Sequence, residues 1–512
     1  MQRRDFIKLG LLTGGLTASK LAFAVTGNSS RPGVQTGIAA GDATYDGAVI
    51  WSRSDLPALM QVEVSGWRDF RQSRFFRGAA ALPEQDYNAR TLLEGLEPGR
   101  EWFYKVRFDS LQTPGIYSEA KSGSFKTAPT KKADVKFCWS GDTAGQGFGI
   151  DPRHDGMLTY KSILAQQPDF FVHCGDLIYA DNPILAEKKL DNGETWHNLT
   201  IPSVTSVAQT QQAFRERYYY NYLDQHHSAL HSKVACYQQW DDHEVRNNWY
   251  PGEQLTDDSR YTEKSVSLLA ERSRQALLQC NPIRPGSVDQ QGLYRKVEYG
   301  PLLDIFILDK RTYRGPNSLN RQQQKSPATA LLGEVQLAWL KQGLSASRAT
   351  WKIIASDMPV GLRITNWGTE IAENMANGDG PPLGRELEMA GLLSHIREHD
   401  IRNVHFITAD VHYCASHYYD PAKAQFKDFL PFWEFVSGPL HAGTFGPNPL
   451  DNTFGPQVVF QGIPANLKPG TAPSAGYQFF GQMEIDSNSE RLTVSHFNRT
   501  GKQLWQTTLE PK

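Results

Sequence analysis

Six apolar segments that each run into an acidic residue constrain the fold of this 512-residue chain more than any other feature. Apolar runs of about four to eight residues are typical of buried strands. The runs cover residues 135–139, 170–174, 234–240, 302–308, 351–355 and 404–408. The acids that follow them are Asp142, Asp176, Asp241 with Asp242, Asp309, Asp357 and Asp410. Because ligands of α/β proteins bind at the carboxyl ends of strands, we expect these acids to meet at one edge of one sheet.

Carboxylates that converge repel one another unless cations lie among them, so the pattern predicts a metal site. A single aspartate after a strand is usually a turn residue or a helix cap, but a repeated pattern favours a shared role. The candidate ligands at the strand ends are Asp142, Asp176, Asp242, Asp410 and His412. All-oxygen sites suit Ca²⁺, Mg²⁺ or Mn²⁺, whereas the phenol of Tyr179 favours a highly charged metal such as Fe³⁺. No cysteine stands at a strand-end ligand position, which disfavours a thiolate-rich zinc site.

Two regions of the chain differ in their pattern of apolar and polar residues. Residues 31–128 contain short alternating segments separated by Gly and Pro, which predicts a β-sandwich. Within them, Leu92–Phe108 resembles the strand–turn–strand of fibronectin type III-like domains. From residue 135 onward, apolar strands alternate with amphipathic helices, which predicts a largely parallel or mixed sheet with helices on its faces. The expected helices cover residues 157–167, 209–232, 263–279, 334–345 and 386–398.

The first 24 residues have the composition of an export signal. Arg3 and Arg4 precede a short apolar stretch, and Ala22-Phe23-Ala24 is a small-x-small cleavage site. The paired arginines resemble a twin-arginine signal, which predicts recognition by the twin-arginine export machinery and a periplasmic or extracellular location. An amphipathic first helix of the mature fold is the alternative. The apolar stretch is shorter than the ~20 residues of a membrane span, and we expect a soluble monomer.

The net charge and the cysteine pattern argue against two further classes of protein, nucleic-acid binders and disulfide-rich proteins. The formal net charge of −2 argues against nucleic-acid binding by bulk positive charge. The five cysteines, Cys138, Cys174, Cys236, Cys280 and Cys414, include no Cys-x-x-Cys pair. Three lie in apolar runs, so we expect buried thiols rather than a disulfide framework.

The order of the acidic motifs resembles that of the calcineurin-like metallophosphatases. The motifs are Asp142 in SGDTAGQG, Gly175-Asp176, Asp242-His243-Glu244 and Asp410-x-His412. The variants GDLIY, WDDHEVRNNW, LDKRTYR and ADVH resemble the PhoD-like family of alkaline phosphatases and phosphodiesterases, which also has a twin-arginine signal and a small β-sandwich. The resemblance implies an α/β metallophosphatase-type β-sheet sandwich flanked by helices, preceded by an all-β Ig/fibronectin III-like sandwich. The expected division is a signal peptide at 1–24, the N-terminal sandwich at 31–128 and the catalytic domain at 135–512.

The resemblance also implies roles for individual residues. Asp176 would bridge two metals, Asp142 and Tyr179 would bind the first, and Asp242 the second. Asp410 and His412 would complete the cluster, and either Asn247 or Asn248 would bind or orient at the second metal. His243 would contact phosphate and protonate the leaving oxygen. Arg311 would bind phosphate or support a ligand, with Asp309 as its partner.

The metals implied by the family are Ca²⁺ and Fe³⁺, with Mn²⁺, Mg²⁺ and Zn²⁺ as alternatives. The founding pattern of the family has an iron-binding cysteine after the first catalytic strand, where this chain has Asp142. Cys138 lies four residues earlier, inside the strand, so the case for the same iron site is weaker.

Several candidate residues also have a purely structural interpretation. Tyr179 is a core aromatic on that interpretation, and Asn247 and Asn248 shape a turn. Arg311 forms a salt bridge with Asp309. Trp240 and Trp249 either line the wall of the pocket or pack in the core, and the sequence favours neither. The segment 181–206 is a lid or a substrate loop.

The residues and the resemblance together predict an exported metal-dependent phosphoric ester hydrolase. It would hydrolyse phosphomonoesters, phosphodiesters or both by direct attack of a metal-bound hydroxide. One alternative is a phospholipase D-like phosphodiesterase, which an exposed apolar rim at the pocket would favour. The other is a non-catalytic exported Ca²⁺-binding module whose sandwich docks on a polymer.

Overall fold

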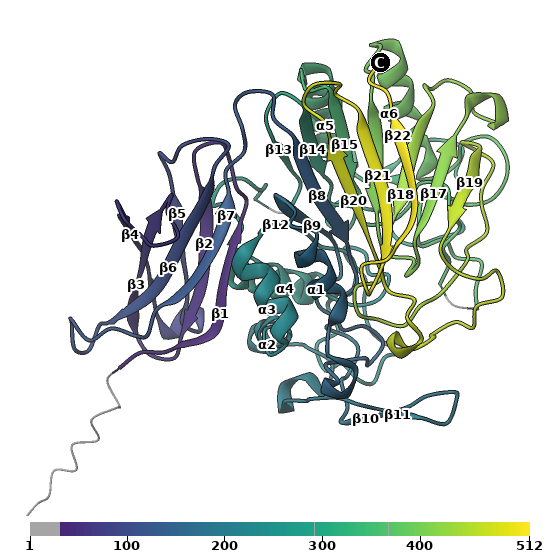
Figure 1. Ribbon diagram of the computed structural model, residues 1–512. Helices are drawn as coiled ribbons and strands as arrows, with labels where there is room; N and C mark the ends of the chain where they lie inside the picture. The colour runs from purple at the N-terminus through teal and green to yellow at the C-terminus, as the bar shows by residue number, and fades with distance from the viewer. Residues whose placement is uncertain (1–30, 291, 367) are drawn as a thin grey trace, which may run out of the picture.

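The computed structural model describes residues 31–290, 292–366 and 368–512, and Figure 1 shows the course of the chain. The expected signal peptide at residues 1–24 lies outside the described residues. The N-terminal strands form two layers. One layer contains β1 (Val34–Gly41), β2 (Ala48–Ser54) and β5 (Asn88–Leu93), and the other has the order β4 (Arg74–Ala81), β3 (Ala58–Ser65), β6 (Glu101–Ser110) and β7 (Lys121–Lys126).

The layer of β1, β2 and β5 continues into the larger part of the molecule. It belongs to a nine-stranded sheet with β22 (Gln503–Leu509), β21 (Leu492–Asn498), β20 (Phe479–Ile485), β8 (Val135–Ser140), β9 (Phe170–Cys174) and β12 (Ala235–Gln239). β1 pairs in parallel with β12, with Gly41 opposite Cys236. Because one sheet crosses the expected boundary near residues 128–135, the division into two domains stays a prediction.

A second, seven-stranded sheet packs against the first. Its strands, in order, are β13 (Arg295–Glu298), β14 (Leu303–Ile307), β15 (Trp351–Ala355), β16 (Val404–Thr408), β18 (Phe432–Val436), β17 (Ala415–Tyr419) and β19 (Pro456–Gln461). The pairs β14–β15, β15–β16 and β16–β18 are parallel. A short hairpin of β10 (Glu187–Lys189) and β11 (Thr195–His197) lies apart from both sheets.

The expectation of a single sheet was therefore wrong. β8, β9 and β12 belong to the first sheet, whereas β14, β15 and β16 belong to the second. A strand that is buried on both faces reads as a continuous apolar run in either sheet, so its sequence does not show which sheet it joins. The sandwich that the family resemblance implied is the observed arrangement.

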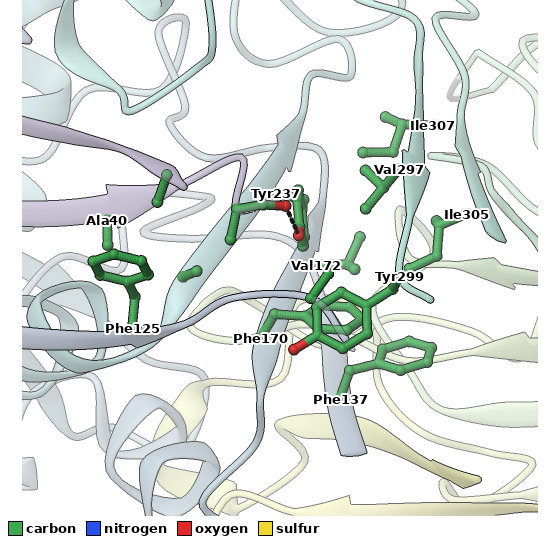
Figure 2. Close-up of a cluster of buried hydrophobic side chains, with 14 of the residues drawn as sticks. Ala40, Phe125, Phe137, Phe170, Val172, Tyr237, Val297, Tyr299, Ile305 and Ile307 are labelled. Atoms are coloured by element: carbon green, nitrogen blue, oxygen red, sulfur yellow. Dashed lines mark hydrogen bonds between the residues drawn. The ribbon is translucent and has the colours of Figure 1, made fainter. Parts of the chain in front are cut away.

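The hydrophobic core lies between the two sheets. Figure 2 shows Phe170 and Val172 of β9 near Ile305 of β14 and the neighbouring Tyr299. The ring of Phe170 packs 4.5 Å from that of Tyr299, between centroids, and 4.8 Å from that of Phe137. All these side chains are buried, and burial of apolar surface is the main force that holds the two sheets together.

Helices cover the outer faces of the sheets. They are α1 (Leu158–Ala165), α2 (Gln211–Asn221), α3 (Gln225–Lys233), α4 (Val266–Cys280), α5 (Gly333–Ala346) and α6 (Glu386–Glu398). Short 3₁₀ turns, each starting at a proline, occur at Pro83–Gln85, Pro152–His154, Pro202–Val204, Pro327–Thr329, Pro421–Lys423 and Pro473–Ala475. α5 and α6 place Leu344 and Leu393 in one cluster with Phe306 and Ile354 of the second sheet. No described helix is long and apolar enough to cross a bilayer.

The single helix expected over residues 209–232 is two helices. The carboxylate of Asp224 accepts hydrogen bonds from the backbone N–H groups of His226 and His227, both at 2.9 Å, and so caps the start of α3. Its second oxygen accepts from the backbone N–H of Met157. A capping aspartate inside an apolar period looks like one more polar helical residue, so the break was not visible in the sequence.

All five cysteines are buried and unpaired, as expected. Cys138 lies within β8 with its thiol hidden from solvent. Burial raises the pKa of that thiol above its ordinary value.

Replacement of Asp224 by Ala should lower the free energy of unfolding by about 2 kcal/mol, the upper part of the range for a lost helix cap, because it leaves three backbone donors unpaired. Urea denaturation followed by circular dichroism measures the change. Asp257→Ala, at an exposed position, is the matched control and should change stability by less than about 0.5 kcal/mol. Equal effects of the two substitutions would contradict the capping role.

Candidate metal centre

The acids that follow strands of both sheets converge at one end of the sandwich. Three sets of side chains have ligand atoms within 4.8 Å of one another: Asp142 with Asp176 and His412, Asp176 with Asp242 and His243, and Asp241 with Asp242 and Asp410. The first two sets share Asp176, and the last two share Asp242. The sharing makes one continuous cluster rather than three separate groups.

The backbone at these positions has an unusual conformation. Asp142, Asp176, Asp410 and His412 have φ of 67°, 54°, 65° and 60°, in the left-handed region. Residues other than glycine rarely adopt this region, and the strain persists where surrounding structure enforces it, often at functional sites. Each of these residues lies in the first turn after its strand, so the tight turn directs its side chain to the end of the sandwich.

The carboxylate of Asp142 shows that this donor set suits a cation. Both of its oxygens are buried and accept no hydrogen bond. Gly438 leaves room for it, because a Cβ atom there would lie 2.3 Å from Asp142 Oδ2. Burial, with neighbouring carboxylates, raises the pKa values of Asp142, Asp176 and Asp410 well above their ordinary value. A cation among these oxygens would favour their ionised forms.

His412 and Tyr179 lie on the Asp142 side of the cluster. The Nδ1 of His412 donates to the carbonyl of Gly443 at 2.5 Å, which leaves Nε2 as an acceptor. That Nε2 lies 2.8 Å from the hydroxyl of Tyr179 and 3.4 Å from Asp142 Oδ1. Burial lowers the pKa of His412 to about 3, so the ring is neutral and has the protonation state of a metal ligand.

His243 lies on the Asp242 side and has a partner that the sequence analysis missed. Its Nδ1 is 2.7 Å from the carboxylate of Asp181, and its ring stacks on that of Tyr179, with centroids 4.1 Å apart. Burial lowers the pKa of His243, but the carboxylates of Asp181 and Asp242 outweigh this effect and raise it to about 9. Asp181 follows Asp176 by five residues in GDLIYAD, and that spacing is the only sequence signal for it.

Glu244 is a further missed residue, and it holds two strand ends together. One oxygen accepts from the backbone N–H of Leu177 at 2.5 Å. The other accepts from the N–H groups of Asp176 at 3.2 Å and Asp241 at 2.7 Å. Glu244 therefore fixes the turns that carry Asp176 and Asp242.

Arg311 lies behind the cluster rather than in the pocket. Its guanidinium is fully buried and contacts Asp241 Oδ1, 2.7 Å from Nε, together with the carboxylate of Glu373. Asp309, expected as its ionic partner, accepts instead from backbone N–H groups, including that of Arg311. This geometry favours support of Asp241 over contact with phosphate.

Two of the six strand ends contribute no acid to the cluster. Asp309 caps the turn that follows β14 and accepts from the hydroxyl and the backbone N–H of Thr312. Asp357 forms a buried ion pair with Lys310, 2.9 Å apart. The expectation that the acids of all six strand ends would converge was wrong for these two, because Asp309 is held by donors of its own turn and Asp357 pairs through one oxygen with Lys310.

Asn247 and Asn248 both line the pocket, and each backbone N–H holds an acid in place. Asn247 donates to Asp181 at 2.9 Å, and Asn248 donates to Asp242 at 2.5 Å. The side-chain amide of Asn248 also donates to Asn366 at 2.6 Å. Both alternatives for the second metal therefore stay open.

The cluster opens into a pocket of about 770 Å³. Its lining includes the metal-ligand candidates Asp176, Asp242, Asp410 and His412, together with His243. Trp240 and Trp249 are not part of the wall; they pack against each other in the core, with ring centroids 5.5 Å apart. The segment 181–206 contains the β10–β11 hairpin, and none of its residues lines this pocket.

Comparison with known proteins places these features in a family. Residues 137–496 match the model of the PhoD-like phosphatases, and residues 18–129 match the model of the PhoD-like phosphatase N-terminal domain. Alkaline phosphatase D of Bacillus subtilis (strain 168) is 27% identical over 477 residues, which are 87% of this chain and 77% of that protein.

Solved structures show the same fold. A structure of PhoD superposes with a TM-score of 0.66 at 20% identity and covers 94% of this chain and 90% of its own. A purple acid phosphatase from yellow lupin (Lupinus luteus) seeds superposes with a TM-score of 0.55 at 14% identity and covers 94% of this chain and 74% of its own.

Replacement of Arg311 by Met should lower the free energy of unfolding by about 3–5 kcal/mol, because it leaves the buried carboxylates of Asp241 and Glu373 without their shared cation. Arg491→Met is the matched control, since it breaks an exposed ion pair with Glu510 and should leave the free energy of unfolding nearly unchanged. Denaturant titration of both variants gives the comparison, and similar losses would show that Arg311 does not hold the acids.

Proposed function

The chain belongs to the PhoD-like phosphatase family and is a phosphoric ester hydrolase, and on that premise we propose that it is an exported, metal-dependent phosphatase acting on phosphomonoesters, phosphodiesters or both. One observation carries the proposal. The buried carboxylate of Asp176 is common to two adjacent sets of ligand atoms at the pocket, as a residue that bridges two cations would be.

The residues divide naturally between two metal positions. Asp142, Tyr179, Asp176 and His412 would hold the first, and Asp176, Asp242 and Asp410, with Asn247 or Asn248, would hold the second. Carboxylate, phenol and imidazole donors suit hard cations, among which Ca²⁺ and Fe³⁺ are our first candidates and Mn²⁺, Mg²⁺ and Zn²⁺ the alternatives. Such a pair supplies charge neutralisation for the phosphoryl group and a water of lowered pKa.

His243 would give a proton to the leaving oxygen. Asp181 holds its Nδ1, so Nε2 is the free nitrogen, 4.0 Å from Asp242 Oδ1 at the pocket. The carboxylate of Asp181 on Nδ1 favours the protonated ring that a general acid requires. Asp181 is thus proposed as a positioning residue for His243.

The two alternatives receive less support. A phospholipase would present large apolar side chains to a lipid surface at the pocket rim, yet none of the exposed large apolar residues in the described chain lines this pocket. A non-catalytic Ca²⁺-binding module would not need the His243–Asp181 pair. The proposals of export by the twin-arginine route and of a periplasmic or extracellular location rest on residues 1–24 alone. We also propose that the protein is a monomer.

Removal of metal should abolish hydrolysis of p-nitrophenyl phosphate and bis-p-nitrophenyl phosphate, with activity restored by added cation. In the loaded protein, Asp142→Asn should lower bound metal, measured by elemental analysis, and reduce activity by about 100-fold. In the metal-free protein the same change should raise the melting temperature at neutral pH, because it removes a carboxyl group whose ionised form is disfavoured by burial and by the neighbouring carboxylates. Asp257→Asn is the exposed control, and unchanged metal content in Asp142→Asn would contradict the site.

Asp181→Asn should reduce the rate by about 100-fold for phenyl phosphate but much less for p-nitrophenyl phosphate, because only the poorer leaving group needs a proton from His243. Steady-state kinetics with both esters gives the ratio. Asp191→Asn, an exposed change in the same segment, should leave both rates unchanged. An equal loss for both esters would exclude the proposed role of Asp181.

A further inference from the structure

The charged side chains that line the pocket are mainly acidic, although the proposed ligand, a phosphate ester, is an anion. The acidic side chains that line it are Asp176, Asp242, Asp410 and Glu370. Among the described residues that line it, Arg363 is the only lysine or arginine. A phosphate ester is itself negative, so cations in this pocket must do more than offset its own carboxylates.

The guanidinium of Arg363 has no partner among the described residues. No carboxylate lies within ion-pair distance of it, and its Nε is buried without a hydrogen-bond acceptor. The buried arginines behind the cluster differ, since Arg311 and Arg314 both pair with Glu373. Buried donors without acceptors cost free energy, which a ligand with acceptor oxygens would recover.

The main chain of Arg363 is nevertheless held firmly at the pocket wall. Its N–H donates to the carbonyl of Pro449 at 2.9 Å, and its own carbonyl accepts from the side-chain amide of Asn448 at 3.4 Å. The preceding Leu362 forms an antiparallel bridge with Leu450. Asn448 and Pro449 also line the pocket. A fixed backbone with an unpaired head group is the arrangement of a preorganised binding residue.

We propose that Arg363 binds a phosphoryl oxygen of the substrate, from the pocket wall outside the metal-ligand cluster. This inference rests on the proposed function and adds a residue that the sequence analysis did not identify. A planar guanidinium can donate two parallel hydrogen bonds to phosphate oxygens, which suits this ligand class better than an ammonium does. Arg363 thus takes the phosphate-contacting role first considered for Arg311, whose guanidinium is already paired.

The test uses the full-length, metal-loaded protein with inorganic phosphate as the probe. Calorimetry gives its dissociation constant, and inhibition of p-nitrophenyl phosphate hydrolysis gives its inhibition constant. Arg363→Gln should weaken phosphate binding by about 10- to 100-fold and raise KM similarly, with unchanged metal content, because a charge-assisted hydrogen bond is lost. Added guanidinium ion should restore part of the affinity in Arg363→Ala.

Two further variants complete the experiment. Arg321→Gln is the matched control, because Arg321 is exposed and does not line the pocket; its phosphate affinity should equal that of the wild type. Arg363→Lys keeps the charge and decides the outcome if Arg363→Gln does not fold. Lysine cannot donate in the planar paired geometry, so we expect phosphate binding several-fold weaker than in the wild type.

The results separate this inference from the proposed function. Wild-type phosphate affinity in Arg363→Gln, or in Arg363→Lys if that alone folds, overturns the inference, and so does absence of phosphate binding by the metal-loaded wild type. If the wild type binds phosphate through Arg363 but hydrolyses no phosphate ester, the proposed function fails and the role of Arg363 as an anion-binding residue stands.

Discussion

Mutual repulsion among buried carboxylates is the constraint on which the candidate metal centre of this molecule depends. Asp142, Asp176 and Asp242 come from turns of one sheet, and Asp410 comes from a turn of the other. The two sheets can pack only if this charge is offset where they meet. Part of the offset is internal, because Arg311 pairs with Asp241 and Lys310 pairs with Asp357. Asp142 has no such partner among the described residues, and both of its oxygens are buried without a hydrogen bond, so a cation beside it would supply the remaining offset.

The sequence was sufficient to predict those parts of the site that are local in the chain. Asp142, Asp176, Asp242 and Asp410 each lie in the first turn after an apolar strand, and the order of the motifs identified the family. The sequence could not predict contacts that depend on how separate loops fold back. Asp181 reaches His243, Glu373 reaches Arg311, and Arg363 reaches the pocket only through the tertiary arrangement. Of the two roles expected for Arg311, support of a ligand residue fits the structure, but its ionic partner is Asp241 rather than the neighbouring Asp309.

The N-terminal strands are integrated with the catalytic part more closely than a linker between two domains would suggest. β1 adds directly to β12, whose end carries Asp241 and Asp242. Asp42, just after β1, forms a buried ion pair with Arg295, 2.9 Å apart. The hydroxyl of Tyr237 in β12 donates to the carbonyl of Ala43. The sandwich therefore supports the strand that positions one side of the metal-ligand cluster, and its removal would expose an edge of that sheet.

The five buried thiols have a consequence for the conditions under which the chain can mature. Since all five are unpaired and buried in the described structure, no covalent cross-link holds the fold together. Folding of this chain thus consumes no oxidant and needs no disulfide exchange. The same native state is accessible in a reducing and in an oxidising compartment, because no cysteine is paired in it.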